Sequence, residues 1–256
     1  MRFQRQENPV CEDKAAVPGT SINAAARTDR SLPKRWIADL KVIDFQEAYN
    51  LQQQISEAKT ARFFNPDVIL VLEHLPVFTL GKRGGSENLK VDTSFLQARG
   101  IPIVPTRRGG NITYHGPGQV IIYPIVDLAR ARMGVADFVS LLEETMITTC
   151  RAFDINAGRN PKNHGIWVGE NKIGSIGLSV KHGVCHHGLA LNVNLDMEPF
   201  TWINPCGLAG VSMTSMAREL ENRNQEPPHD MVGTVRQTLV KSLAEATGFK
   251  LEPVPI

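Results

Sequence analysis

Features that mark membrane, secreted and nucleotide-binding proteins are missing from this sequence of 256 residues. No run approaches the roughly 18 apolar residues that a membrane-spanning helix needs, and no apolar signal-peptide core opens the chain. No G-x-x-x-x-G-K-[S/T] loop occurs, and no G-x-G-x-x-G string opens a predicted helix, so neither common phosphate loop is present. Because 42% of the residues are hydrophobic, the sequence still predicts a soluble protein with an ample core.

Cysteine is scarce: the chain holds only Cys11, Cys150, Cys185 and Cys206. An even number could form two disulfides, but four cysteines are few for a chain of this length. No C-x-x-C pair occurs, which excludes a zinc ribbon and a thioredoxin-type motif. We therefore expect reduced thiols in a cytoplasmic protein.

An excess of charge of one sign is also lacking, because the formal net charge is +2. The first 35 residues hold seven Lys/Arg and four Asp/Glu, which leaves 21 basic and 22 acidic residues in the rest. A near-neutral body gives little support for nucleic-acid binding, so no nucleic-acid partner and no membrane partner are expected. Attraction for an acidic protein partner would have to come from local patches.

Residues 1–35 lack hydrophobic periodicity and contain three prolines. This composition predicts a disordered N-terminal tail. Arginine and alanine are common there, which leaves an organelle transit peptide as an alternative, but four acidic residues argue against it. Residues 36–256 are expected to form a single domain.

Strands and helices alternate along that domain, which predicts an α/β or α+β fold. Residues 67–74 (DVILVLEH) are a nearly continuous apolar run, typical of a strand buried on both faces. Asp44 and Glu47 form a D-x-x-E capping box, which predicts a helix over residues 45–63. Further strands are expected at 36–40, 77–80, 101–105, 118–128 and within 165–195, the last group with turns at Glu170-Asn171 and His182-Gly183. Further helices are expected at 134–153, 214–222 and 230–247, the last one ended by Gly248.

RRGGNITYHGPGQ, residues 107–119, is the densest unusual segment of the sequence. Its four glycines predict close backbone approach or positive φ, and two arginines and a histidine stand among them. An ordinary glycine-rich connection is the alternative, and a single RGG copy between two strands is a poor nucleic-acid patch. So many special residues in thirteen positions favour a ligand-binding segment.

Lys172 opens a strand-like run, NKIGSIGLSV, directly after a turn. Gly174 and Gly177 have no side chain, so a ligand could approach the backbone there. A solvent-exposed edge lysine is the ordinary alternative, since most lysines are exposed.

Three histidines follow at His182, His186 and His187, and they raise the question of a metal site. His186 and His187 are adjacent, so on a strand they would face opposite ways. No carboxylate stands at a suitable spacing. We therefore expect no metal.

Cys206 lies in a Pro-Cys-Gly turn within TWINPCGLAG, an unusual place for a buried structural thiol. A cysteine is a nucleophile only as its thiolate, so it needs a base or a nearby cation. No histidine is adjacent in the sequence, but Lys172 could serve as the base if it is close in space. The residues alone leave a structural thiol, half of a disulfide, a metal ligand and a nucleophile open.

Five segments resemble, in order and spacing, those of the lipoyl(octanoyl) transferase family: LEHLPVFTLG (72–81), RGGNITYHGPGQ (108–119), KIGSIGL (172–178), HGLALNVN (187–194) and INPCG (203–207). The resemblance covers roughly residues 36–250 and leaves out the tail. It implies the fold of biotin and lipoate protein ligases, a mixed sheet flanked by helices.

The resemblance also implies a reaction. Octanoyl-acyl carrier protein would give its octanoyl group to a lysine of a lipoyl domain, in 2-oxoacid dehydrogenase complexes or in the glycine cleavage H protein. Cys206 would be the nucleophile, activated by Lys172, with no cofactor and no metal. The substrate would be lined by Arg108, Gly109, Gly110, Asn111, Ile112, Thr113, Tyr114, His115, Ser175, Ile176, Gly177, Gly188, Leu189 and Ala190.

Three other functions stay open. A lipoate or biotin protein ligase would use ATP and would not need a nucleophilic cysteine. An amidotransferase would take octanoate from an octanoylated protein. A non-catalytic lipoyl-domain binding module would form no acyl-enzyme. For recruitment, we expect Lys82, Arg83 and Arg108 to form local basic patches that attract acidic partners.

Overall fold

The computed structural model describes residues 35–161, 163–207 and 210–255, and for Cys206 it describes the backbone alone. The predicted tail lies outside the described residues except for Arg35. That residue begins the first strand and is buried.

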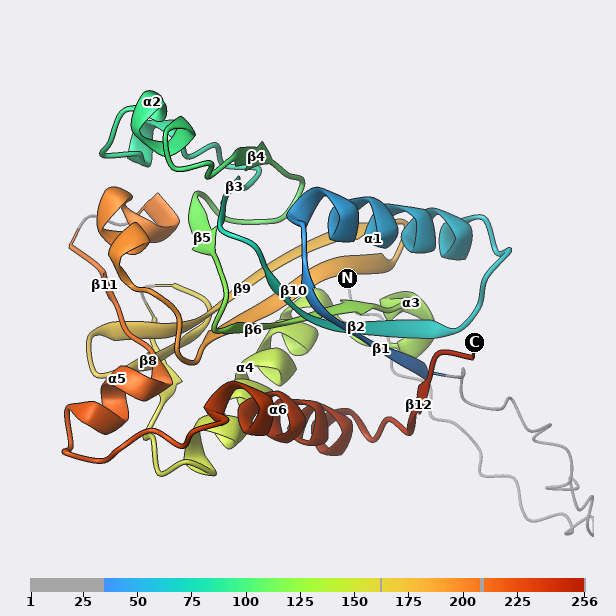
Figure 1. The fold of residues 1–256 in the computed structure, drawn as a ribbon. Coiled ribbons are helices and arrows are strands. Elements are labelled where there is room, and N and C mark those ends of the chain that lie inside the picture. Colours follow the sequence, from blue (N-terminus) through green and yellow to red (C-terminus); the bar gives the residue numbers. More distant parts are fainter. Residues whose placement is uncertain (1–34, 162, 208–209, 256) are drawn as a thin grey trace, which may run out of the picture. The chain divides into compact units, whose positions relative to one another are not determined.

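A mixed sheet of nine strands runs through the described chain in the order β12-β1-β2-β6-β10-β9-β8-β7, with β11 paired to β9 (Figure 1). Strand β1 pairs in parallel with β2 and β12, whereas β2, β6, β10, β9 and β8 pair antiparallel in succession. The predicted mixed sheet is thus confirmed. The strands are Arg35–Ile43 (β1), Asp67–His74 (β2), Gln119–Ile125 (β6), Gly158–Arg159 (β7), Ile166–Val168 (β8), Asn171–Lys181 (β9), Val184–Asn192 (β10), Ser212–Met213 (β11) and Leu251–Pro253 (β12).

Helices cover both faces of this sheet (Figure 1). The side chains of β2 point alternately to the two faces and pack against different helices. Ile69 and Val71 pack into the core that the helices Val135–Arg151 (α4) and Met231–Thr247 (α6) close. Leu70 and Leu72 point to the other face, toward the helix Phe45–Thr60 (α1). Because side chains alternate along a strand, an apolar residue at every position is what burial on both faces requires.

The predicted helix boundaries follow from capping. Asp44 accepts hydrogen bonds from the backbone N–H groups of Gln46 and Glu47, so it caps α1 as the sequence predicts. Gly248 ends α6 in the left-handed conformation, with a φ of 65°. Three short helices complete the set: Thr93–Gln97 (α2), Leu128–Ala131 (α3) and Met216–Glu221 (α5). No helix in the described ranges is long and apolar enough to cross a membrane.

A second, three-stranded sheet lies beside the large one and was not predicted as a unit. Its order is β4-β3-β5, from Ile103–Pro105 (β4), Val77–Leu80 (β3) and Thr113–His115 (β5). It packs on its own apolar cluster, which includes Phe78, Leu96 and Phe200. This sheet carries the glycine-rich segment to β9, where the N–H of Gly109 donates to the Leu178 carbonyl oxygen at 2.8 Å.

The turn between β9 and β10 falls at His182-Gly183, as predicted, with φ values of 50° and 84°. Positive φ at both central residues matches the twist of a two-residue hairpin. The turn before β9 falls at Gly169-Glu170, one residue earlier than predicted, because Asn171 already belongs to the strand.

Candidate functional site

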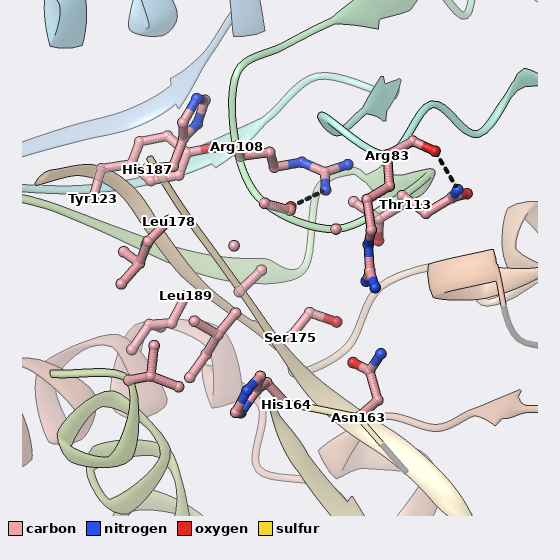
Figure 2. Close-up of a pocket in the computed structure, with 18 of the residues that line it drawn as sticks. Arg83, Arg108, Thr113, Tyr123, Asn163, His164, Ser175, Leu178, His187 and Leu189 are labelled. Atoms are coloured by element: carbon pink, nitrogen blue, oxygen red, sulfur yellow. Dashed lines mark hydrogen bonds between the residues drawn. The ribbon is translucent and has the colours of Figure 1, made fainter. Parts of the chain in front are cut away.

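A cavity of about 510 Å³ opens between the β9–β10 pair, the glycine-rich segment and the start of α4 (Figure 2). This volume is typical of a small-molecule site. All the predicted substrate-lining residues except Tyr114 lie on its wall. Three sequence segments that are far apart in the chain therefore converge on one space, although their contact with substrate stays a prediction.

Tyr114, unlike the other predicted lining residues, faces away from this cavity. Thr113 and His115 line the cavity, and Tyr114 stands between them on β5, where alternation turns it to the other side. Its ring packs 5.2 Å from that of Phe78 and 5.6 Å from that of Phe200. Burial, reinforced by Asp196, raises the pKa of Tyr114 to about 12.

Arg108 is buried and does not belong to a surface patch, which corrects the predicted grouping with Lys82 and Arg83. Its Nη2 donates to the carbonyl oxygen of Thr79 at 2.6 Å and to the Thr79 hydroxyl at 2.8 Å. Its Nη1 donates to the Gly109 carbonyl at 3.1 Å, as Figure 2 shows. The guanidinium therefore ties the cavity wall to β3. Lys82 and Arg83 are exposed, and Arg83 lines the cavity.

Close backbone approach explains part of the glycine pattern, as predicted. Gly110 has a φ of 90°, which is costly for any other residue. A side chain on Gly81 would stand only 2.2 Å from the Gly110 carbonyl oxygen. The two loops can thus touch because Gly81 lacks a Cβ atom, while Gly110 supplies the positive φ.

Uncharged rings form the inner end of the cavity. Phe45, His115, Tyr123 and His187 line it, with Phe45 and His115 stacked 6.2 Å apart. Burial, reinforced by His74 and Arg108, lowers the pKa of His115 to about 3. Burial also holds the pKa of His187 well below its usual range and raises the pKa of Tyr123. These rings are neutral at physiological pH, and the nearby guanidinium of Arg108 is hydrogen-bonded to Thr79 and Gly109.

Buried histidines should make the fold sensitive to acid. Burial lowers the pKa of His74 to about 4, whereas an unfolded imidazole titrates near 6.5. Between these values the unfolded chain binds more protons, so the stabilising contribution is complete above pH 6.5 and is lost as pH falls toward 4. We expect the free energy of unfolding to fall by several kcal/mol from pH 7.5 to 4.5, from His74 and His115 together.

Denaturant unfolding across that pH range measures the effect. His74→Gln should flatten the slope of unfolding free energy against pH, whereas His229→Gln, at an exposed position, should leave it unchanged. If unfolding free energy fell equally steeply with pH in His74→Gln and in the unmodified protein, His74 would not be a source of the acid sensitivity.

His186 and His187 lie on the same side of the sheet, so the prediction that they face opposite ways is wrong. Their ring centroids are 5.0 Å apart. His187 has a φ of 58°, which breaks the alternation of β10, and its N–H donates to Oε1 of Gln52 on α1 at 2.8 Å. Within the described ranges, no group of three or more His, Cys, Asp or Glu residues gathers as a metal site.

Lys172 is buried, with a side chain that ends beside the cavity wall. The residue is 1% exposed, which rules out the ordinary exposed edge lysine. Its Nζ donates to Oδ1 of Asn163 and to the carbonyl oxygen of His164, both at 2.7 Å. Asn163 and His164 line the cavity (Figure 2). The amino group is therefore held by two oxygens at the end of the cavity opposite the uncharged rings.

Gly165 makes room for this lysine. Its φ is 112°, and a Cβ atom there would lie 2.9 Å from Cε of Lys172 and 2.3 Å from the Gly174 carbonyl oxygen. The strand β8, which follows Gly165, can pair closely with β9 only without that side chain. No motif in the sequence indicated this role.

The segment that carries Cys206 is anchored on two sides. Cys206 lies in the 3₁₀ turn Pro205–Gly207, and just before it Asn204 donates its N–H to the Asn88 carbonyl at 2.8 Å. After the turn, β11 pairs in parallel with β9 so that Met213 stands opposite Lys172. The backbone thus returns to the Lys172 strand, while contact between the Cys206 and Lys172 side chains stays a prediction.

Asn163 and His164 were missed by the sequence reasoning, although a signal existed. The predicted hairpin before β9 is antiparallel, so the residues that precede β8 lie toward the middle of β9. Extending the register by two residues beyond the Ile166–Gly174 pair brings His164 opposite Ile176, which was predicted to line the substrate. Phe45, Tyr123 and Arg83 carried no such signal, because distant segments bring them to the cavity.

Cys150 and Cys185 are free, buried thiols. Burial raises the pKa of each to about 12. Because only the thiolate reacts, we expect native protein treated with iodoacetamide at pH 8 to leave both unmodified. Peptide mass spectrometry measures this, with the denatured protein as the control that both sites react once exposed. Modification of either in the native state would contradict the expectation.

Comparison with known proteins decides the family. Residues 44–243 match the model described as the lipoyl protein ligase A/B catalytic domain. The chain belongs to this family. Within the lipoyl protein ligase A/B family, it is 47% identical over 186 residues to an octanoyltransferase of Desulfotalea psychrophila, covering 72% of this chain and 83% of that protein. It is 42% identical over 189 residues to an octanoyltransferase of Syntrophobacter fumaroxidans, covering 74% and 82%.

Solved structures of lipoate protein ligases share the fold. A lipoate-protein ligase A bound with ATP aligns with a TM-score of 0.62 at 15% identity, over 88% of this chain and 89% of that one. A bipartite lipoate protein ligase of Thermoplasma acidophilum aligns with a TM-score of 0.62 at 15% identity, over 88% of each chain. The predicted lipoate ligase fold is confirmed.

Proposed function

We propose that this protein is an octanoyltransferase that moves the octanoyl group of octanoyl-acyl carrier protein to a lysine of lipoyl domains, through a thioester on Cys206. One observation carries the proposal. Three of the five motif segments, at 108–119, 172–178 and 187–194, converge on one cavity with buried Lys172 beside its wall. The names and identities of the sequence relatives support octanoyl as the group transferred.

The cavity suits an alkyl chain. Its side walls are formed by aliphatic residues of α4, β9 and β10: Val135, Val139, Ile176, Leu178, Leu189 and Ala190. Burial of each CH₂ group contributes about 0.8 kcal/mol, so an eight-carbon chain gains about 5 kcal/mol of binding free energy. The carbonyl group would then lie toward the end where Asn163 and His164 hold Lys172.

The reaction proceeds in two exchanges at one carbonyl carbon. Lys172 accepts the Cys206 proton, the thiolate attacks the octanoyl thioester, and the carrier sulfur leaves and takes the proton from Lys172. In the second exchange the acceptor lysine attacks the Cys206 thioester, its proton passes to Lys172, and the Cys206 sulfur leaves and recovers a proton. Thioester exchange is nearly isoenergetic and amide formation is downhill, so no ATP is consumed.

The acceptors we propose are the lipoyl domains of 2-oxoacid dehydrogenase complexes and the glycine cleavage H protein, and the product is the precursor of bound lipoate. The reaction needs no cofactor and no metal. Residues 36–256 would act as one catalytic domain, which the pairing of β12 with β1 supports. A cytoplasmic location is supported by the free thiols of Cys150 and Cys185.

An assay with and without ATP tests the proposal. The full chain is incubated with octanoyl-acyl carrier protein and a lipoyl domain, and the octanoylated domain is measured by mass spectrometry. We expect full transfer without ATP and none from free octanoate plus ATP. Transfer only from free octanoate with ATP would establish a ligase instead. Transfer only from an octanoylated protein would establish an amidotransferase, and no transfer from any donor would leave a binding module.

A further inference from the structure

A second cavity, of about 370 Å³, is lined by the C-terminal half of α1 and by the β9–β10 hairpin. It is distinct from the first cavity. Lys181, on its wall, stands at the other end of β9 from Lys172, roughly 30 Å away along the strand. His186 lines this second cavity while His187 lines the first, so the two spaces share one wall.

Three permanent cations from separate segments surround this space: Lys82 after β3, Arg107 before β5 and Lys181 on β9. All three are exposed, and none makes an ion pair with a carboxylate of the described residues. Glu57 is the one acidic residue on the described wall. The C-terminal end of α1 adds a partial negative charge of about half a unit. The wall therefore keeps a net positive charge.

His186 supplies the buried polar group of this cavity. It is 6% exposed, and neither ring nitrogen has a hydrogen-bond partner among the described residues. An unsatisfied buried polar group costs about 1–3 kcal/mol, so a bound acceptor would recover that free energy. Burial and the nearby Lys82, Arg107 and Lys181 lower the pKa of His186 to about 4. All three cations line the same cavity as this imidazole.

We propose that the second cavity binds a phosphate group, which Lys82, Arg107 and Lys181 surround and His186 contacts by hydrogen bonding. A phosphate combines negative charge with several acceptor oxygens, which matches converging cations and an unused N–H group. The phosphate belongs to a free phosphate compound, because the prosthetic arm of a carrier protein spans less than about 20 Å even when extended and cannot join this cavity to the Lys172 end of β9. The site therefore does not depend on the function proposed above.

Titration with inorganic phosphate tests the site without any activity measurement. The full chain, labelled in its histidine rings, is followed by NMR, and the His186 signal is assigned by its loss in His186→Gln. We expect a saturable shift of that signal and a rise in the His186 pKa, because a bound anion favours the charged ring. Potassium chloride at equal ionic strength is the control for screening.

Two matched double variants decide whether the cations hold the phosphate. Arg107→Gln/Lys181→Gln should weaken phosphate binding at least tenfold, while unchanged signals of the other histidines report an intact fold. Lys241→Gln/Lys250→Gln removes the same charge from exposed positions elsewhere and should leave the affinity unchanged. A shift that does not saturate, that chloride reproduces, or that survives unchanged in the Arg107/Lys181 variant would overturn the proposal.

Two small donors test whether the donor arm reaches this cavity. Because the arm is too short, octanoyl-phosphopantetheine and octanoyl-pantetheine should have equal KM, both in the unmodified protein and in Arg107→Gln/Lys181→Gln. A KM at least tenfold lower for octanoyl-phosphopantetheine, lost in that variant, would assign the phosphate to the donor arm and overturn the free compound. Absence of all transfer would refute the octanoyltransferase proposal and leave the titration result standing.

Discussion

Replacing Cys206 by alanine is expected to lower octanoyl transfer to a lipoyl domain by about 10⁴-fold or more. The reason is chemical: without the thiol, no acyl-enzyme forms, and the acceptor amine must meet the carrier thioester directly. Initial rates with saturating octanoyl-acyl carrier protein measure the loss in kcat.

The matched control is Cys11→Ser, since Cys11 lies outside residues 44–243 that match the family. This variant should keep the full rate. If Cys206→Ala retained a tenth of the rate or more, the covalent mechanism would be wrong, and a ligase that needs no cysteine would become the better explanation.

Replacing Lys172 by methionine is expected to lower kcat about 10³-fold, the usual contribution of a general acid–base group. Methionine keeps most of the volume but cannot carry a proton. The two oxygens that Lys172 now contacts, on Asn163 and His164, belong to residues that are not fully buried, so water can replace the lost bonds. The fold should therefore survive, which thermal unfolding checks.

Lys172→Arg separates proton transfer from charge. Arginine keeps the positive charge but does not release its proton in proteins, so it should be nearly as inactive as methionine. The control, Lys241→Met, changes an exposed lysine of α6. A Lys172→Arg enzyme within tenfold of the full rate, with an unchanged pH–rate profile, would show that Lys172 only positions other groups.

The large sheet could be predicted from the sequence because its strand β2 is a continuous apolar run. Every residue from Val68 to Leu72 is apolar and buried, so burial on both faces followed from composition alone. The helix caps predicted at Asp44 and Gly248 are both confirmed. Such features can be predicted because they depend only on residues that are neighbours in the sequence.

The small sheet was not predicted as a unit, because its pairing is not local. Strand β3 pairs in parallel with β4 and antiparallel with β5, across loops that no short pattern specifies. Consequently the side-chain direction within RGGNITYHGPGQ could not be assigned. Thr113 and His115 face the cavity and Tyr114 faces the core, a distinction that follows directly once β5 is known.

The sequence identified the segments that form the site, but it did not predict where their side chains point. Charge suggested a surface role for Arg108, but its guanidinium is buried against Thr79. Alternation suggested opposite faces for His186 and His187, but the positive φ of His187 brings their rings together. Both errors come from tertiary contacts that override local rules.

The covalent intermediate on Cys206 is the central claim, and intact mass spectrometry tests it most directly. The full chain is incubated with octanoyl-acyl carrier protein without an acceptor, then mapped by peptide mass spectrometry. The account predicts one octanoyl group, on Cys206, that is labile to hydroxylamine, absent in Cys206→Ala and discharged when a lipoyl domain is added. An enzyme that transfers octanoate while no octanoyl group is found on Cys206 would contradict it.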